Sequence, residues 1–192
     1  MNIGVLALQG AFIEHINILQ ELGANATAVR LPSHLSKLDG VIIPGGESTT
    51  ILKIMRDFKL LTPLKTIIEN GVPVLGTCAG MICLANNILN NGLSPLGVID
   101  ISVKRNAFGR QKESFETDLS IPALGPKPYH AVFIRAPIIT NVGKSVSILA
   151  ELPDGTPVAA AQDRILVTAF HPELTDDLRF HEYFLDIVSK IG

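Results

Sequence analysis

The sequence predicts an α/β fold: a doubly wound, mainly parallel sheet with helices on both faces and added antiparallel strands. In the first half of the chain, continuous apolar runs alternate with segments whose apolar residues recur at helical spacing. Such runs are typical of parallel strands buried on both faces. Two Gly-rich turns, at residues 44–48 and 76–80, each join an apolar run to a helical segment. The chain has 192 residues, 47% of them hydrophobic, which suits one domain spanning residues 1–192.

The first half of the chain supplies the main sheet and its first helices. Strands are expected at residues 3–8, 26–31, 38–44 and 73–77. Helices are expected at residues 12–22, 48–58 and 61–70. Gly23 and Gly71 follow the first and third of these helices and are typical stop signals. The hydroxyl of Ser48 or Thr49 is expected to cap the second helix.

The second half of the chain is richer in short β-prone runs. These runs lie at residues 98–103, 114–121, 130–136, 145–152, 158–162 and 165–170. They predict the added antiparallel strands and an extension of the main sheet. A final helix is expected at residues 176–190.

Composition excludes several classes of function. A net charge of −2 gives no reason to expect nucleic acid or an acidic membrane surface as a partner. The apolar runs are all shorter than a membrane span. The two cysteines have no histidine close to them in sequence, so no metal site is expected. Such sparse cysteine use fits a reducing compartment, and a cytoplasmic protein is expected.

The sequence GTCAG at residues 76–80 has the pattern of a nucleophile elbow, with Cys78 as the nucleophile. Glycines two residues on either side allow a sharp turn between strand and helix. The free N–H groups at the start of the helix favour negative charge on the thiol. The competing interpretation is an inert, buried cysteine in an ordinary turn. Cys83 is expected to be a small core residue.

A base and its orienting carboxylate are available at His171 and Glu173, after an apolar strand. Pro172 disfavours helical geometry at His171, so the segment is expected to be extended. Residues i and i+2 then face the same way, and the carboxylate can reach one imidazole nitrogen. Of the other histidines, His15 and His181 are expected on helix faces, the first with its hydrogen bonds satisfied and the second solvated.

The turn PGGES at residues 44–48 follows another expected strand end, where ligands bind in open parallel sheets. The backbone N–H groups of Gly46 and Ala79 are expected to form an oxyanion hole. Phosphate binding is the competing interpretation, but the turn lacks the lysine of a P-loop. Arg105 and Arg135 are candidates for binding a carboxylate.

Together these motifs resemble class I, triad-type glutamine amidotransferases. Further sequence blocks narrow the resemblance to the glutaminase subunits of pyridoxal 5′-phosphate synthase. These blocks are LQG at residues 8–10 with EH at 14–15, GESTT at 46–50, RNAFGRQ at 105–111, SFE at 114–116, FIRAP at 133–137 and FHPEL at 170–174. They extend from the first strand almost to the last helix.

The resemblance implies that the chain hydrolyses L-glutamine to L-glutamate and ammonia. It assigns catalysis to Cys78, His171 and Glu173. It also implies that the amino-acid end of glutamine is bound by Gly46, Glu47, Ser48, Arg105, Ile134 and Arg135. One allocation by charge gives the α-carboxylate to Arg105 or Arg135 and the α-ammonium group to Glu47.

The resemblance further implies a partner. Ammonia would pass to a lyase subunit, a (β/α)₈ barrel that makes pyridoxal 5′-phosphate from ribose 5-phosphate and glyceraldehyde 3-phosphate. The glutaminase subunit itself is expected to hold no cofactor and no metal. Two other interpretations of the sequence stay open: a PfpI-like thiol hydrolase or chaperone, and a non-catalytic binding module in which Cys78 only packs.

Overall fold

A computed structural model describes residues 1–89, 92, 94–105 and 114–190 of the chain. Its main feature is a seven-stranded sheet with the strand order β10-β11-β12-β4-β3-β1-β2. The strands are β1 (Asn2–Leu6), β2 (Asn25–Val29), β3 (Gly40–Ile43), β4 (Val74–Thr77), β10 (Ser147–Glu151), β11 (Pro157–Gln162) and β12 (Ile165–Thr168). The five strands from β12 to β2 are parallel, and β10 and β11 extend the sheet in antiparallel fashion.

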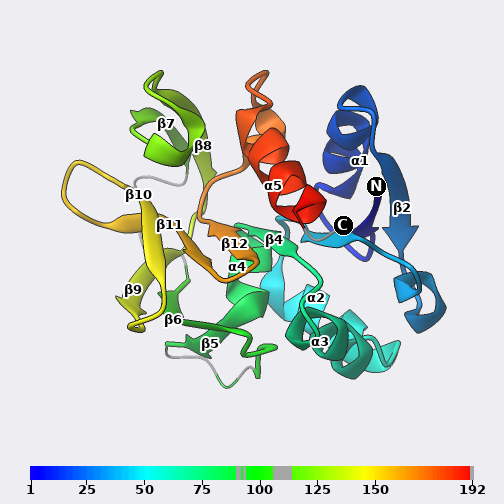
Figure 1. Cartoon of the computed structure of the whole chain (residues 1–192). Coiled ribbons are helices and arrows are strands. Elements are labelled where there is room, and N and C mark those ends of the chain that lie inside the picture. Colours follow the sequence, from blue (N-terminus) through cyan, green and yellow to red (C-terminus); the bar gives the residue numbers. More distant parts are fainter. Residues whose placement is uncertain (90–91, 93, 106–113, 191–192) are drawn as a thin grey trace.

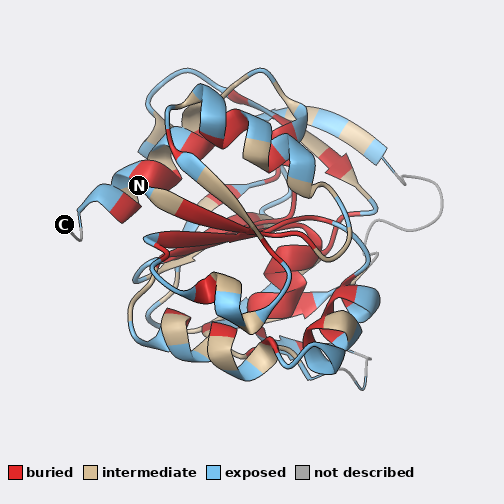
Figure 2. Cartoon of the chain, turned by 90° about the vertical axis from the view of Figure 1, so that its right-hand side faces the viewer, coloured by how far each residue is buried: buried red, intermediate tan, exposed pale blue. Residues whose placement is uncertain are grey.

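Helices cover both faces of this sheet (Figure 1). Figure 2 shows the buried strands as a layer between helices above and below. One face carries α1 (Phe12–Glu21) and α5 (Arg179–Ser189), and the other carries α2 (Ser48–Asp57), α3 (Leu61–Glu69) and α4 (Ala79–Leu84). The opposite faces follow from topology, because the chain moves outward from β1 to β2 but in the other direction from β3 to β4. The predicted doubly wound α/β class is confirmed.

Two smaller sheets flank the main sheet. One contains β5 (Ala85–Ile88), β6 (Ile99–Lys104) and β9 (Ile138–Val142), and the other pairs β7 (Ser114–Leu119) with β8 (Tyr129–Ile134). The pairs β6–β9 and β7–β8 are antiparallel, in keeping with the prediction of added antiparallel strands, whereas β5 and β6 pair in parallel. Strands β5 and β9 were not predicted. Two residues in the middle of β5 are exposed and β9 has a single buried residue, so neither strand gives a continuous apolar run.

Several element boundaries differ from the predictions. The cap of α2 is Glu47 rather than Ser48 or Thr49, because its carboxylate accepts hydrogen bonds from the N–H groups of Thr49 and Thr50. The last helix begins at Arg179 rather than at residue 176. Within the described part of the chain, every helix is too short or too polar to cross a membrane.

Candidate active site

The carboxyl ends of neighbouring parallel strands bring the predicted catalytic residues together. Cys78 directly follows β4, and His171 lies three residues after β12. These two strands pair in register, with Thr77 opposite Thr168. The N–H of Cys78 donates a 2.8 Å hydrogen bond to the carbonyl of Thr168, which fixes the nucleophile against the neighbouring strand.

Cys78 occupies a sharp turn between β4 and α4, as the elbow pattern predicts. Its φ of 49° and ψ of −100° lie outside the regions that L-residues ordinarily adopt. The turn is possible because Gly80 packs directly on the carbonyl of Ile43, where a Cβ atom would collide. A Cβ on Gly76 would come within 2.8 Å of the Gly80 carbonyl carbon. The flanking glycines therefore allow a backbone approach that side chains would prevent.

His171 and Glu173 form the expected pair, but the local backbone differs from the prediction. Nδ1 of His171 lies 2.7 Å from Oε1 of Glu173. The segment Pro172–Leu174 is a short 3₁₀ helix, η3, rather than an extended chain. The tight turn, rather than two-residue alternation, brings the carboxylate back to the imidazole. Only 7% of His171 and 5% of Glu173 is exposed, so the pair is shielded from water.

The third contact joins His171 to Cys78. Burial favours the neutral imidazole, but hydrogen bonds to Cys78 and Glu173 outweigh it and raise the pKa of His171 to about 10. The imidazole also packs closely on Gly45, where an added Cβ would come within 2.9 Å of Nδ1. The structure thus places thiol, imidazole and carboxylate in the continuous arrangement needed for nucleophilic catalysis.

A cavity of about 250 Å³ opens above Cys78 and His171. It is lined by Gln9, Gly46, Glu47, Ser48, Cys78, Ile82, Arg105, Ile134, Arg135 and His171. All six of the predicted substrate-binding residues are in this lining. Residues 106–111 of the RNAFGRQ block lie outside the described part of the chain. The sulfur of Cys78 lies 3.9 Å from the carbonyl oxygen of Ile134.

Two arginines lie at the rim of the cavity. Arg105 directly follows β6, and its guanidinium binds Glu47 Oε1 at 2.9 Å and Thr49 Oγ1 at 3.0 Å. Arg135 directly follows β8, is exposed, and has a positive φ of 44°. Arg135 therefore avoids the cost of burial and projects from a strained backbone position, a feature often found at ligand sites.

Glu47 has both carboxylate oxygens engaged. They accept hydrogen bonds from Thr49 N, Thr50 N, Thr50 Oγ1 and Arg105. Burial opposes ionisation, but the hydrogen bonds from Thr50 and Thr49 outweigh it and lower the pKa of Glu47 to about 2. Four donors fill the acceptor positions of a carboxylate. This saturation weakens the expectation that Glu47 binds an α-ammonium group and gives it the task of fixing Arg105.

Two further polar groups face the cavity. The hydroxyl of Ser48 is buried and has no hydrogen-bond partner among the described residues, so it is open to a ligand. Gln9 was not among the predicted site residues. Its Oε1 accepts a 2.7 Å hydrogen bond from the N–H of Glu47 and lies against Gly46. The sequence feature that could have identified Gln9 is its position directly after the expected strand at residues 3–8, next to a glycine.

One expectation about histidines was wrong. His15 and His181 are both fully buried and contact each other, with 2.9 Å between His15 Nδ1 and His181 Nε2. His181 is thus not solvated, whereas the hydrogen-bonding groups of His15 are satisfied, as expected, by partners from other elements. Cys83 is fully buried, as predicted, and burial raises the pKa of its thiol.

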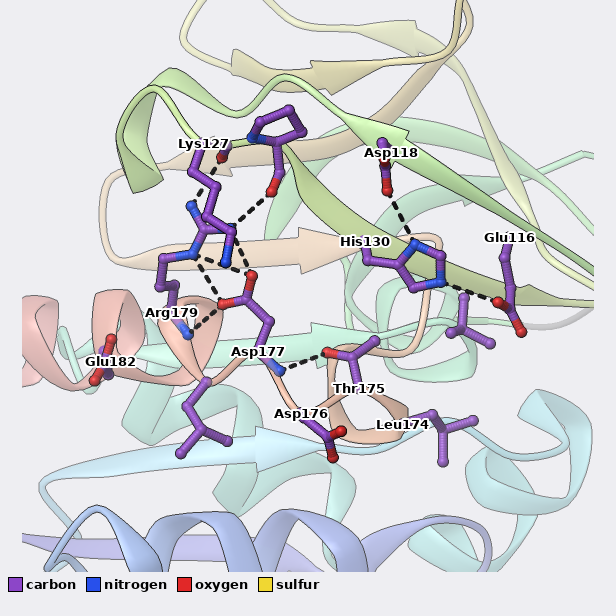
Figure 3. A pocket seen from close by; sticks show the side chains of 13 residues that line it. Glu116, Asp118, Lys127, His130, Leu174, Thr175, Asp176, Asp177, Arg179 and Glu182 are labelled. Carbon is purple, nitrogen blue, oxygen red and sulfur yellow. Dashed lines mark hydrogen bonds and ion pairs between the residues drawn. The ribbon is translucent and has the colours of Figure 1, made fainter.

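A larger hollow, of about 960 Å³, lies between the β7–β8 pair and the start of α5 (Figure 3). Several of its charged side chains are paired with one another. His130 bridges Asp118 and Glu116 at 2.9 Å each, while Arg179 binds Asp177 and nearby carbonyl groups. None of the catalytic candidates lines it. The smaller cavity is therefore the candidate active site.

Comparison with known proteins agrees with this geometry. The SNO glutamine amidotransferase family matches residues 5–190. Proteins named "Pyridoxal 5′-phosphate synthase subunit PdxT" from Carboxydothermus hydrogenoformans and Herpetosiphon aurantiacus are each 56% identical over 190 residues. These alignments cover 99% and 97% of this chain, and 99% and 100% of the relatives.

A solved structure described as a glutamine amidotransferase superposes with a TM-score of 0.92 at 46% identity. The superposition covers 97% of this chain and 98% of the other. The resemblance predicted from the sequence motifs is confirmed. The chain belongs to the SNO glutamine amidotransferase family.

Proposed function

We propose that the chain hydrolyses L-glutamine to L-glutamate and ammonia, as the glutaminase subunit of pyridoxal 5′-phosphate synthase. The observation that supports this most directly is the contact series from Cys78 through His171 to Glu173, at the floor of a cavity with an arginine rim. The cavity is smaller than the roughly 300–1,000 Å³ typical of sites for drug-sized ligands, which suits a substrate of amino-acid size.

In the first half of the reaction, the thiolate of Cys78 attacks the side-chain carboxamide carbon of glutamine. A C–S bond forms, and the carbonyl oxygen becomes an oxyanion. The N–H groups of Gly46 and Ala79 are proposed to hold that oxygen. His171, as imidazolium, protonates the amide nitrogen, and the C–N bond breaks to release ammonia.

In the second half, a water molecule attacks the γ-glutamyl thioester. His171, now neutral, accepts a proton from this water, and the C–S bond breaks to give glutamate and the thiolate. Glu173 fixes the orientation of the imidazole in both halves and stabilises its charged form. The raised pKa of His171 is consistent with this task.

The amino-acid end of glutamine is proposed to lie toward the rim. Arg105 or Arg135 binds the α-carboxylate, since a guanidinium suits two-point binding of a carboxylate. Ser48 offers its unpartnered hydroxyl to the same part of the substrate. Gly46 and Ile134 contribute backbone groups, and Glu47 contributes through its hold on Arg105.

The proposed partner is the lyase subunit of pyridoxal 5′-phosphate synthase, a (β/α)₈ barrel. It would combine the ammonia with ribose 5-phosphate and glyceraldehyde 3-phosphate. We infer that residues 1–192 act as a single glutamine amidotransferase domain without a metal or cofactor of their own. A cytoplasmic location is proposed, since the sparse use of cysteine, with Cys78 and Cys83 both free, fits a reducing compartment.

The test is glutamate release from glutamine, measured with and without the lyase subunit. Cys78→Ala is expected to abolish release while leaving the fold intact. Cys83→Ala is the matched control, because this second cysteine lies in the core and outside the cavity. Turnover retained by Cys78→Ala in the presence of the lyase subunit would overturn the assignment of the nucleophile.

The same preparation separates the other two interpretations. A PfpI-like thiol hydrolase would cleave peptides rather than glutamine. A non-catalytic binding module would leave Cys78 unlabelled by a glutamine-like electrophile such as diazo-oxo-norleucine, even with the lyase subunit bound.

A further inference from the structure

A buried polar cluster surrounds the second carboxylate oxygen of Glu173. Nε2 of His15, in α1, lies 3.4 Å from Glu173 Oε2 and 3.3 Å from Oγ1 of Thr77. Nδ1 of His15 lies 2.9 Å from Nε2 of His181, in α5. All three partners of His15 have fully buried side chains or are nearly so. One imidazole therefore links both helices of this face to the end of β4 and to the catalytic carboxylate.

Both histidines of the cluster are neutral near neutral pH. Burial lowers the pKa of His15 well below its ordinary value, and the nearby His181 and His171 lower it further. Burial lowers the pKa of His181 to about 4. A neutral imidazole carries one N–H and one nitrogen lone pair. Each ring is therefore in one of two tautomers, with the proton on Nδ1 or on Nε2.

The contacts favour the Nε2–H form of both rings. In that form His181 donates to Nδ1 of His15, and His15 donates from Nε2 to Oγ1 of Thr77, while the same nitrogen lies 3.4 Å from Glu173 Oε2. The Nδ1–H tautomer of both rings would turn the Nε2 lone pair of His15 toward the carboxylate. It would also leave an N–H on Nδ1 of His181, which has no hydrogen-bond partner among the described residues. Buried N–H groups without acceptors are rarer and costlier than buried lone pairs without donors.

The carboxylate needs this second contact. The terminal torsion of a glutamate side chain is broad, so one hydrogen bond to Oε1 leaves the carboxylate free to rotate. His171 holds Oε1 at 2.7 Å. Oε2 accepts no well-aligned hydrogen bond from the described residues, and His15 is the cation-capable side chain within ion-pair distance of it. The partial positive charge of the His15 Nε2–H group, whose nitrogen lies 3.4 Å from Oε2, attracts this oxygen and narrows the rotation of the carboxylate.

We propose that His15, itself held by His181, is a positioning residue whose Nε2–H group attracts Oε2 of Glu173 and thereby fixes the carboxylate for His171. This inference rests on the glutaminase triad proposed above. Neither histidine lines the cavity, so both act through Glu173 rather than on the substrate. The expected consequence is an effect on turnover and not on binding of glutamine.

The test compares His15→Leu, which removes the N–H, with His15→Gln, whose amide can place an N–H near the position of Nε2. Glutamate release is measured with the lyase subunit bound. His15→Leu is expected to lower kcat about tenfold or more, the effect typical of outer residues that orient a functional imidazole. KM for glutamine should stay within about twofold, and His15→Gln should recover much of the loss. An unchanged kcat in His15→Leu would overturn the proposal.

A loss of kcat in His15→Leu could come from destabilisation of α1 or from a misplaced Glu173 carboxylate, and a control variant distinguishes the two causes. Ile18→Ala serves as the control, because Ile18 is a buried residue of α1 outside the cluster. If Ile18→Ala lowers kcat as much as His15→Leu at equal loss of stability, the positioning role is refuted. Cys78→Ala in the same assay tests the glutaminase function separately, since an active Cys78→Ala would contradict that function and not merely the role of His15.

A spectroscopic measurement tests the direction of the N–H groups. Nitrogen-15 NMR distinguishes Nδ1–H from Nε2–H histidines through their two-bond couplings. Both His15 and His181 are expected as Nε2–H forms in the intact protein. Observation of His15 in the Nδ1–H form would overturn the proposal, because the lone pair would then face Glu173.

Discussion

Arg105 binds Glu47 across the rim of the active-site cavity, with 2.9 Å between Arg105 Nη2 and Glu47 Oε1. The same carboxylate caps α2 through the N–H groups of Thr49 and Thr50. The start of the helix therefore sets the position of the carboxylate, and the carboxylate sets the position of the guanidinium. The exposed fractions are 26% for the arginine side chain and 47% for the glutamate side chain, so the ion pair adds little to stability. Its main effect is to fix the position of the Arg105 guanidinium.

Substitutions at the two ends of this pair are expected to differ. Arg105→Met and Glu47→Ala should both raise KM for glutamine, because each leaves the rim without a fixed guanidinium. Only Glu47→Ala should also lower the free energy of unfolding, by about 1 kcal/mol, since it removes a helix cap. Steady-state kinetics and urea unfolding measure the two effects. Equal losses of stability in both variants would show that the cap is not the source.

Replacing Glu173 by Gln tests the carboxylate of the triad. The loss of charge weakens the hydrogen bond and removes the electrostatic attraction that raise the pKa of His171, so the imidazolium becomes less stable. We expect kcat to fall by a factor between about 10² and 10⁴, the range for general acid–base groups and their orienting partners. Glutamate release with the lyase subunit bound measures this effect. A matched Glu69→Gln change, on an exposed helix end, should leave kcat unchanged.

The buried His181 predicts a loss of stability in acid. Its pKa is about 4 in the folded protein and 6.5 when exposed, so the unfolded chain binds more protons between these values. The free energy of unfolding therefore falls as the pH drops from about 6.5 toward 4. His181 alone lowers it by about 2 kcal/mol between pH 7 and pH 5. His15 acts in the same direction. His171 does not, because its pKa is raised and its contribution is lost only as the pH rises through about 10.

The measurement is the urea unfolding free energy of the wild type and of His181→Gln at both pH values. The variant should lose about 2 kcal/mol less than the wild type on acidification. An identical pH dependence in the two proteins would contradict neutral burial of this imidazole.

The close packing of the nucleophile elbow predicts that adding one methyl group at Gly80 lowers both stability and activity. Gly80→Ala would place a Cβ against the carbonyl of Ile43, which is backbone of the central strand β3 and cannot move aside. We expect destabilisation of about 1–3 kcal/mol, the usual range for overpacking, together with loss of activity from displacement of Cys78. Thermal unfolding measures the former. Gly92→Ala is the control, since no atom of the described residues lies within 4 Å of the Cβ position there.

The main sheet and the grouping of Cys78, His171 and Glu173 were predictable because their signals are local. The apolar runs of buried parallel strands, the glycines around Cys78 and the spacing of His171 and Glu173 all lie within short segments. The rule that ligands bind at the carboxyl ends of parallel strands then joins them. The reasoning was incomplete at Pro172, where a 3₁₀ turn produces the contact that was attributed to an extended chain.

The histidine cluster was missed because it depends on residues 166 positions apart. A contact between His15 and His181 requires α1 and α5 to lie on the same face, which follows only from the order of the strands. A partial signal was present. His15 lies four residues before Leu19, and His181 lies three before Phe184 and four before Leu185, so both occupy the apolar stripe of their helices. Polar residues on a buried stripe call for partners.

The pairing of Thr77 with Thr168 has a consequence for engineering and for divergence within the family. Sulfur and imidazole inherit their spacing from a hydrogen-bonded ladder in the rigid centre of the molecule, while the guanidinium groups come from the peripheral sheets. Surface segments can therefore be exchanged or lengthened to suit a new docking partner without retuning the reaction centre. Variation should concentrate in those outer sheets, and the central ladder should tolerate little of it.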